Sequence, residues 1–264
     1  MSISTNSSEN QLGNDPLTPL LAELSFSAEV YLHSRFCGIW GVDTSGSGRL
    51  PFHLISSGRG WLHGPDGECI ALTPGDLVLF PHDSPHVVSD SPTTCDATDM
   101  VAGDIDPTTR EEPVTSMICG FFKLDGGAAL LDNLPESIVM ELSDTSRYPD
   151  ARLLMQMMIG ELENPKPGNQ VVVDQLAKAL FVHILRLQMD KGLCSGLLAA
   201  LFDARVGKAL SLIHSEPEQH WSLDSLARAS HQSRTMLAKR FKELVGVTPM
   251  RYLTGWRMRR ATRL

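Results

Sequence analysis

The stretch WSLDSLARASHQSRTMLAKRFKELVGVTPMRYLTGWRMRRATRL, residues 221–264, has the most regular helical signals in the chain. Ser222 is placed to cap a helix over residues 223–230, because a serine side chain accepts hydrogen bonds from the open amides of a first helical turn. Ser233 is placed in the same way before residues 234–245. The stretch therefore predicts two short helices joined by a tight turn.

A third helix is predicted from the residues that follow. Gly246 is suited to end the second helix, because glycine adopts the left-handed conformation without strain. Thr248 can cap the next helix, and Pro249 fits its first turn. The apolar side chains of the second helix recur on one side, where they can pack against the first helix. These inward residues are Leu237, Phe241, Leu244 and Val245.

The polar side of the second helix has the composition of a DNA-reading surface. Its outward residues are Arg234, Thr235, Ala238, Lys239 and Lys242. In a helix-turn-helix, the second helix enters the major groove and its N-terminal half meets the base edges. Arg234 can pair with guanine, and Thr235 can pack on a thymine methyl group. The helical pattern alone fits a small helical bundle with a charged surface equally well.

Other basic side chains are expected to neutralise phosphates, which positions a protein on DNA without specifying the sequence. These are Arg240, Lys242, Arg251, Arg257, Arg259, Arg260 and Arg263. The charge distribution agrees with this expectation. Residues 205–264 contain twelve Lys and Arg against four Asp and Glu, whereas residues 1–204 have a net charge of −16. A basic end on an acidic body favours a polyanionic partner at that end only.

The segment SRTMLAKRFKELVGVTPMRYL, residues 233–253, resembles the first recognition helix, glycine stop and following turn of the AraC/XylS family of transcription regulators. WRMRRA, residues 256–261, resembles the start of that family's linking helix. The resemblance places four residues in groove-facing positions: Arg234, Thr235, Ala238 and Lys239. It also implies a second helix-turn-helix after the linking helix, whereas this sequence stops at Leu264. We expect a truncated product; the alternative is a chain that must dimerise to bind DNA.

The N-terminal part of the chain shows strand patterns. Short apolar runs over residues 28–124 are separated by Gly, Pro, Asp and Ser, which is typical of a sandwich or barrel of β-strands. They follow a polar stretch over residues 1–16, which we expect to be a disordered tail, and a short helix over residues 17–24. Residues 89–115 are polar and predict a long loop.

The run GDLVLFPHDSPH, residues 75–86, resembles the second conserved motif of the cupins, with its Pro turn and final histidine. His53 stands at one ligand position of the first cupin motif, although Ile55 replaces the second histidine. With Cys119 on a later strand, His53 and His86 would form a zinc site. The alternative is that the two histidines form hydrogen bonds inside a barrel, in which case no cofactor is expected.

Residues 17–190 as a whole resemble the cupin-type sensor of a subgroup of AraC-family regulators. Some members of that subgroup respond to oxidants through cysteines, and Cys37 and Cys119 stand where those members carry theirs. A disulfide between the two requires Cα atoms within about 7 Å. The alternative is that each is a buried, unreactive thiol. The remaining cysteines, which have no assigned role, are Cys69, Cys95 and Cys194.

Residues 149–162 and 171–191 have helical periodicity. The apolar stripe of the second segment consists of Val173, Leu176, Leu180, Ile184 and Leu187. This stripe either packs on its own domain or forms the seam of a homodimer. The expected fold is α+β: a cupin-like β-barrel sensor domain over residues 17–146, a helical linker with possible dimerisation over 147–196, and an all-α helix-turn-helix domain over 197–264.

No apolar run approaches the ~18 residues that a membrane helix needs, and the polar N-terminus without Lys or Arg is no signal peptide. We therefore expect a cytoplasmic protein with reduced cysteines and no membrane partner. The leading hypothesis is a sequence-specific DNA-binding transcription regulator, not an enzyme, that binds promoter DNA and whose cupin domain senses a small molecule or an oxidant. The alternatives are a cupin-fold metal-dependent enzyme and a dimerising co-regulator that lacks DNA binding.

Overall fold

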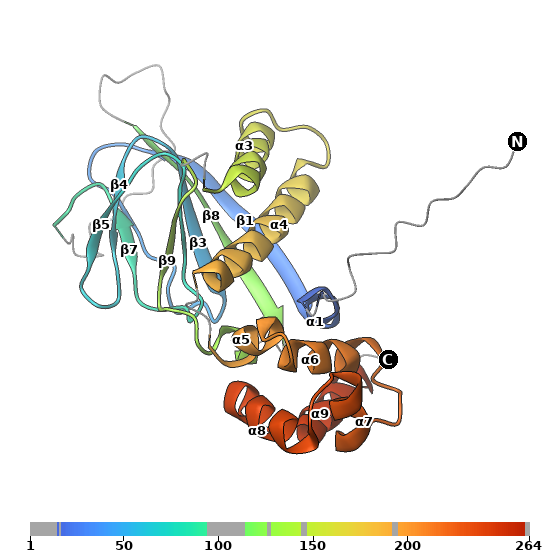
Figure 1. The fold of residues 1–264 in the computed structure, drawn as a ribbon. Helices are drawn as coiled ribbons and strands as arrows, with labels where there is room; N and C mark the ends of the chain where they lie inside the picture. The colour runs from blue at the N-terminus through green and yellow to red at the C-terminus, as the bar shows by residue number, and fades with distance from the viewer. Residues whose placement is uncertain are drawn as a thin grey trace, which may run out of the picture. The chain divides into compact units, whose positions relative to one another are not determined.

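The computed structural model describes residues 15, 17–93, 114–125, 128–143, 147–191 and 195–261. Most of the predicted tail and of the predicted long loop lies outside these ranges. Contacts divide the chain into two compact units, one formed by Phe26–Leu193 and the other by Met1–Ser25 together with Cys194–Leu264 (Figure 1). Among the described residues, no helix combines the length and the apolar character needed to cross a bilayer.

The first unit contains two β-sheets. The five-stranded sheet has the order β1 (Ser25–Phe36), β8 (Thr115–Asp125), β3 (Leu50–Ser57), β6 (Asp76–Leu79) and β9 (Ile138–Glu141). The four-stranded sheet has the order β2 (Gly41–Val42), β7 (Val87–Ser89), β4 (Gly60–His63) and β5 (Cys69–Leu72). Strand β3 pairs antiparallel with β8 and β6, so His53 lies opposite Cys119 on one side and Val78 on the other.

The central strands of the larger sheet are buried on both faces. Successive side chains of a strand point to opposite faces, and on β3 both Phe52 and His53 are buried. Ile55 belongs to a core cluster that includes Leu62 and Val88 of the smaller sheet. On the other face, Phe52 stacks on Phe122 with a ring-centroid distance of 4.6 Å. His53 therefore lies in an apolar interior.

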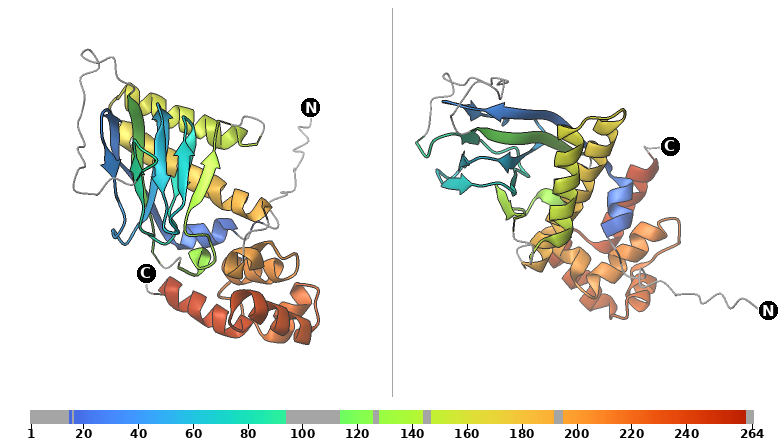
Figure 2. Two further views of the ribbon diagram at one scale, coloured as in Figure 1. Left: turned by 90° about the vertical axis from the view of Figure 1, so that its left-hand side faces the viewer. Right: turned by 90° about the horizontal axis from the view of Figure 1, so that it is seen from above.

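The two sheets confirm the α+β class and correct the expected closed barrel. Among the described residues, each strand pairs only within its own sheet. A barrel needs continuous hydrogen bonding around its circumference, and β2 and β7 contain only two and three residues, too few to bridge both sheets. The sheets instead form the two layers of a sandwich (Figure 2).

Helices cover the outer face of the five-stranded sheet. The helices of this unit are α2 (Ala128–Leu131), α3 (Pro149–Glu163) and α4 (Asn169–Asp190). Helices α3 and α4 pack on each other (Figure 2). Phe181 of α4 lies against the rings of Phe26 and Phe122, each at a centroid distance of 4.9 Å.

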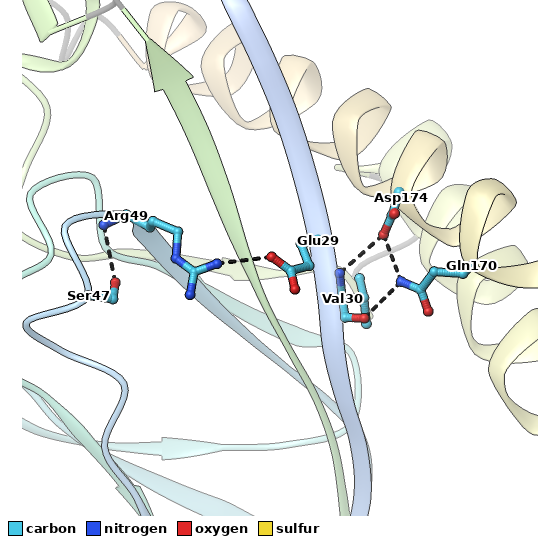
Figure 3. Close-up of polar contacts among 6 residues, drawn as sticks. All are labelled: Glu29, Val30, Ser47, Arg49, Gln170 and Asp174. Carbon is cyan, nitrogen blue, oxygen red and sulfur yellow. Dashed lines mark hydrogen bonds and ion pairs between the residues drawn. The ribbon is translucent and has the colours of Figure 1, made fainter.

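Hydrogen bonds also join α4 to β1 (Figure 3). Val30 donates its backbone N–H to the Asp174 carboxylate at 3.2 Å, and its carbonyl accepts from the Gln170 amide at 2.9 Å. The neighbouring Glu29 forms an ion pair with Arg49 at 3.0 Å. The long edge strand β1 is thereby held through its backbone by α4 and through a side chain by the start of β3.

The apolar stripe predicted in residues 171–191 packs within its own unit. Val173, Leu180 and Ile184 are buried, and Leu176 and Leu187 are half-buried. Of the two alternatives left open by the sequence, packing on the same domain accounts for the buried positions of the stripe.

The second unit is all-helical. Its helices are α1 (Leu17–Glu23), α5 (Gly196–Phe202), α6 (Val206–Ser215), α7 (Leu223–Ala229), α8 (Arg234–Val245) and α9 (Pro249–Ala261). Helix α1 contacts α6, and the contacts group residues 17–23 with the C-terminal helices. The fully buried core side chains include Leu226, Leu237, Phe241, Leu253 and Trp256.

The helix boundaries expected from the sequence are confirmed by the caps. The Ser222 hydroxyl accepts from the Ser225 amide at 3.1 Å, and the Ser233 hydroxyl accepts from the Met236 amide at 3.3 Å. Gly246 ends α8 in the left-handed conformation, with φ of 81°. Helices α7 and α8 and their turn therefore form the predicted helix-turn-helix.

Candidate functional site

The residues predicted to read DNA share one face of α8. Four of them are exposed: Arg234, Thr235, Lys239 and Lys242. Ala238 lies between them and is half-buried. Residues at these spacings are neighbours on a helix surface, while Leu237 and Phe241 of the opposite face are buried. The structure thus brings the five predicted residues together on a single outward surface.

Two of these cations form long ion pairs. Arg234 lies 3.7 Å from a carboxylate oxygen of Asp224 in α7, and Lys239 lies 4.0 Å from one of Glu243. The charged side chains are well exposed, at 67% for Arg234 and 73% for Lys239. Exposed pairs of this kind contribute roughly 0–1 kcal/mol. A phosphate or a base edge can therefore replace these carboxylates easily.

Arg257, which was also predicted to contact DNA, forms hydrogen bonds within the protein. Its Nε donates to the Pro217 carbonyl at 2.6 Å and its Nη2 to the Gln219 carbonyl at 2.7 Å. The guanidinium thereby ties α9 to the loop between α6 and α7. No sequence pattern indicates this role, because the acceptors are backbone carbonyls, which every residue type carries.

The remaining predicted phosphate contacts are spread over α8 and α9. Arg251, Arg259 and Arg260 are exposed on α9, and Arg260 lies 3.9 Å from Glu218. Arg263 lies outside the described residues. Arg240 is turned to Asp203, whose carboxylate accepts a hydrogen bond from its Nε at 3.2 Å and forms an ion pair with its Nη2 at 3.2 Å.

In the first unit, a polar cluster lies between the two sheets. The Nε2 atoms of His53 and His86 are 3.1 Å apart. The Thr44 hydroxyl lies 3.2 Å from the His53 Nε2 and 3.0 Å from the His86 Nε2. On the other side of the His53 ring, Nδ1 lies 3.1 Å from the Cys119 Sγ. His86 Nδ1 donates to the Ser84 carbonyl at 2.7 Å.

The cluster is uncharged. Burial, together with the neighbouring His86, lowers the pKa of His53 to about 3. Burial likewise lowers the pKa of His86, although the Ser84 carbonyl opposes this effect. Burial raises the pKa of the Cys119 thiol. All three groups are therefore neutral near pH 7.

The proton positions follow from the partners. A carbonyl only accepts, so neutral His86 carries its proton on Nδ1 and accepts at Nε2. His53 then donates from Nε2 and accepts at Nδ1 from the Cys119 thiol. This gives a chain of hydrogen bonds that runs from Cys119 through His53 and His86 to Ser84. The Thr44 hydroxyl lies within hydrogen-bond distance of both Nε2 atoms.

The three residues predicted to hold zinc do not surround one point. Cys119 contacts Nδ1 of His53, whereas His86 contacts Nε2 on the far side of the same ring. A zinc ion bonded to either nitrogen at about 2.0 Å would be out of reach of the ligand on the other side. Within the described ranges, no group of three or more His, Cys, Asp or Glu side chains is arranged to hold a metal ion.

The two predicted redox cysteines lie in different environments. Cys37 follows directly after β1, which ends at Phe36, and is half-buried. Cys119 lies in the middle of β8, is buried and contacts His53. A disulfide between the two stays a prediction.

A two-sheet unit with a buried polar cluster, combined with a helix-turn-helix whose basic face is exposed, defines a sensor-linked transcription regulator. Residues 15–190 match the cupin family model Cupin_6. An AraC-like transcription regulator of Streptomyces antibioticus is 30% identical over 253 residues, which cover 92% of this chain and 83% of the relative. An HTH-type transcriptional regulator of Haemophilus influenzae is 29% identical over 243 residues, covering 88% and 79%. The regulator MtrA of Neisseria gonorrhoeae is 29% identical over 262 residues, covering 92% and 82%.

The chain belongs to the cupin family and to the AraC-like transcription regulators. The family expected from the sequence is therefore confirmed, and with it the general function of a DNA-binding transcription regulator with a sensing domain.

Proposed function

We propose that the chain recognises promoter DNA through the outward face of α8. Arg234, Thr235 and Lys239 meet base edges in the major groove, and Lys242 contacts a phosphate. The observation that carries this proposal is the division of α8 into an exposed cationic face and a buried face formed by Leu237 and Phe241. The second helix of a helix-turn-helix has these two faces: the buried one packs on the first helix, and the exposed one enters the major groove.

The other predicted residues take supporting roles in this proposal. Ala238 is small, which lets the helix backbone come close to the groove floor. Arg251, Arg259 and Arg260 neutralise phosphates. Arg257 keeps the loop between α6 and α7 in place, since two of its donors already bond to carbonyls of that loop.

Alanine substitutions test the assignment of α8. Arg234→Ala and Lys239→Ala are expected to weaken binding to a duplex enriched from a random-sequence pool by the unaltered chain. Loss of one base contact corresponds to about 1–3 kcal/mol, or roughly a 5- to 150-fold higher Kd. Lys123→Ala, which removes an exposed cation from β8, is the matched control and is expected to leave the Kd unchanged. Unaltered affinity in both α8 variants would refute the assignment.

We further propose that the two-sheet unit senses a small molecule. The support is the cluster of Thr44, His53 and His86, whose polar atoms lie among apolar side chains between the sheets. An oxidant is a less suitable signal, because the thiolate is the reactive form of cysteine and burial raises the pKa of Cys119.

Thiol labelling distinguishes the two signals. The chain is treated with hypochlorite, denatured and alkylated, and the label on Cys37 and Cys119 is measured by mass spectrometry. Equal labelling with and without hypochlorite supports a small-molecule signal. Joint loss of label from the two cysteines would favour the oxidant.

The same proposal includes a cytoplasmic homodimer without enzymatic activity. The relatives are named as transcription regulators, and the donor geometry does not suit the zinc site of a metalloenzyme.

Leu153 and Met157 of α3 are one turn apart and 59% and 58% exposed, which offers an apolar surface to a second copy. Sedimentation of the unaltered chain and of Leu153→Gln tests this surface; equal mass at all concentrations would contradict it.

A further inference from the structure

Asp203 follows the C-terminal end of α5, and its carboxylate accepts three hydrogen bonds. One carboxylate oxygen accepts from the backbone amides of Arg205 at 3.1 Å and Val206 at 2.9 Å, at the start of α6. The other oxygen accepts from Nε of Arg240 at 3.2 Å and forms an ion pair with its Nη2, also at 3.2 Å. The carboxylate therefore joins three helices.

The charge of Asp203 is set by these contacts. Burial alone would raise the pKa of its carboxyl, but the amides of Val206 and Arg205 and the Arg240 guanidinium outweigh burial and lower the pKa. The Asp203 side chain is only 17% exposed, against 50% for Arg240. Solvent therefore screens this ion pair less than it screens the pairs of Arg234 and Lys239.

A second contact ties the same junction to the turn before α8. The Gln232 side-chain amide donates to the Arg205 carbonyl at 3.1 Å. The junction between α5 and α6 is thus bonded to the residue just before the α8 cap and to a residue in the middle of α8. Two attachments along one helix restrict both its position and its rotation about its own axis.

Arg240 lines a pocket of about 450 Å³ beside Asp203, together with Met236, Lys239 and Glu243. Its guanidinium donates to Asp203 from Nε, so it is already bound within the protein, whereas the sequence led us to expect a phosphate contact. The pair spans 37 residues of sequence, which is why no local pattern revealed it.

We propose that Asp203 is a positioning residue for DNA binding: through Arg240 it holds α8 in the orientation that presents its outward face to the major groove. The inference rests on the proposed function, in which α8 reads DNA. It assigns to an acidic side chain a favourable role in binding a polyanion. Electrostatics alone predicts the reverse, because a negative charge near DNA weakens binding.

The direction in which one substitution changes the Kd for DNA separates the two possibilities. Asp203→Asn removes the charge but keeps a side-chain oxygen that can accept from the α6 amides, as asparagine does in helix caps. With the full chain and the pool-enriched duplex, we expect roughly a three- to tenfold higher Kd, the size expected for weakening a charged hydrogen bond that is partly screened. The slope of log Kd against log salt concentration should not change, because no phosphate contact is lost.

Three further variants make the test specific. Glu243→Gln removes a negative charge that is 3.9 Å from Arg240 and 4.0 Å from Lys239, and this variant should bind DNA as tightly as the unaltered chain or more tightly. Arg240→Lys keeps the positive charge but has no planar guanidinium that can donate to Asp203 from Nε, and it should match Asp203→Asn. In the double variant the two losses should not add, as expected for residues that act as a pair.

Asp203→Asn that binds DNA as tightly as, or more tightly than, the unaltered chain would overturn the inference. Losses that add in full in the double variant would also overturn it, because they would show that the two residues act independently. Thermal unfolding of each variant reports whether the fold is kept, and Arg240→Lys carries the test if Asp203→Asn unfolds. Failure of the proposed function is recognised separately, because Arg234→Ala and Lys239→Ala would then bind normally.

Discussion

The two units of the chain place their polar side chains in opposite environments. In the helical unit, the cations Arg234 and Lys239 lie in water and are paired with carboxylates at 3.7 Å and 4.0 Å. In the two-sheet unit, His53 and His86 are buried, neutral and bonded to each other at 3.1 Å. The first arrangement is exposed and exchanges partners readily, whereas the second is buried and its polar atoms bond mainly to one another. Substitutions on the face of α8 should therefore alter binding, and substitutions in the cluster should alter stability.

The largest loss of stability is expected from a substitution on the buried face of α8. Phe241→Ala removes a fully buried ring from the core of the helical unit, and truncation of a buried Phe costs about 3–5 kcal/mol. Urea unfolding followed by the fluorescence of buried Trp256 should show the loss. Met236→Ala on the same helix, where the side chain is 50% exposed, is the control and should change stability by less than about 1 kcal/mol. Equal losses in the two variants would contradict the described packing of α8.

A smaller effect is expected in the two-sheet unit when the pH falls. The pKa of His53 is about 3 in the folded chain, against about 6.5 in an unfolded chain. Between these values the unfolded chain binds the proton and the folded chain does not. The stability that comes from neutral His53 is therefore complete above about pH 6.5 and decreases as the pH falls, by about 1.4 kcal/mol per unit and roughly 2–3 kcal/mol by pH 4.5.

Unfolding of the unaltered chain and of His53→Asn between pH 7 and 4.5 measures this contribution. The variant should lose less stability on acidification, because asparagine does not titrate. His220→Asn in the helical unit, at an exposed position, is the matched control. A pH dependence in His53→Asn equal to that of the unaltered chain would show that His53 is not buried in its neutral form.

The smallest loss of stability is expected from removing the cap at the start of α8. Ser233→Ala removes the hydroxyl that accepts from the Met236 amide and should lower stability by about 1 kcal/mol. Ser215→Ala, at an exposed position in α6 where the hydroxyl bonds to the Ser211 carbonyl, is the control and should stay within about 0.5 kcal/mol of the unaltered chain. A cap that makes no contribution would leave the two variants indistinguishable.

The difference between the units also explains what could be predicted from the sequence. The helix-turn-helix depends on local signals, and Ser222, Ser233 and Gly246 mark its boundaries within a few residues of the contacts they make. The sandwich depends on pairing between strands distant in sequence, such as His53 opposite Cys119. The motifs therefore identified His53 and His86 but not the side of the ring on which Cys119 lies. Contacts such as Asp203 with Arg240 leave no periodic pattern.

The central claim is that the outward face of α8 reads base pairs. The most direct test is to enrich duplexes from a random-sequence pool with the unaltered chain and with Arg234→Ala, and to compare the enriched sequences. Because an arginine at the N-terminus of a recognition helix contacts a single base pair, the variant should lose its preference at one position and keep the others. Identical enriched sequences for the two chains would contradict the claim.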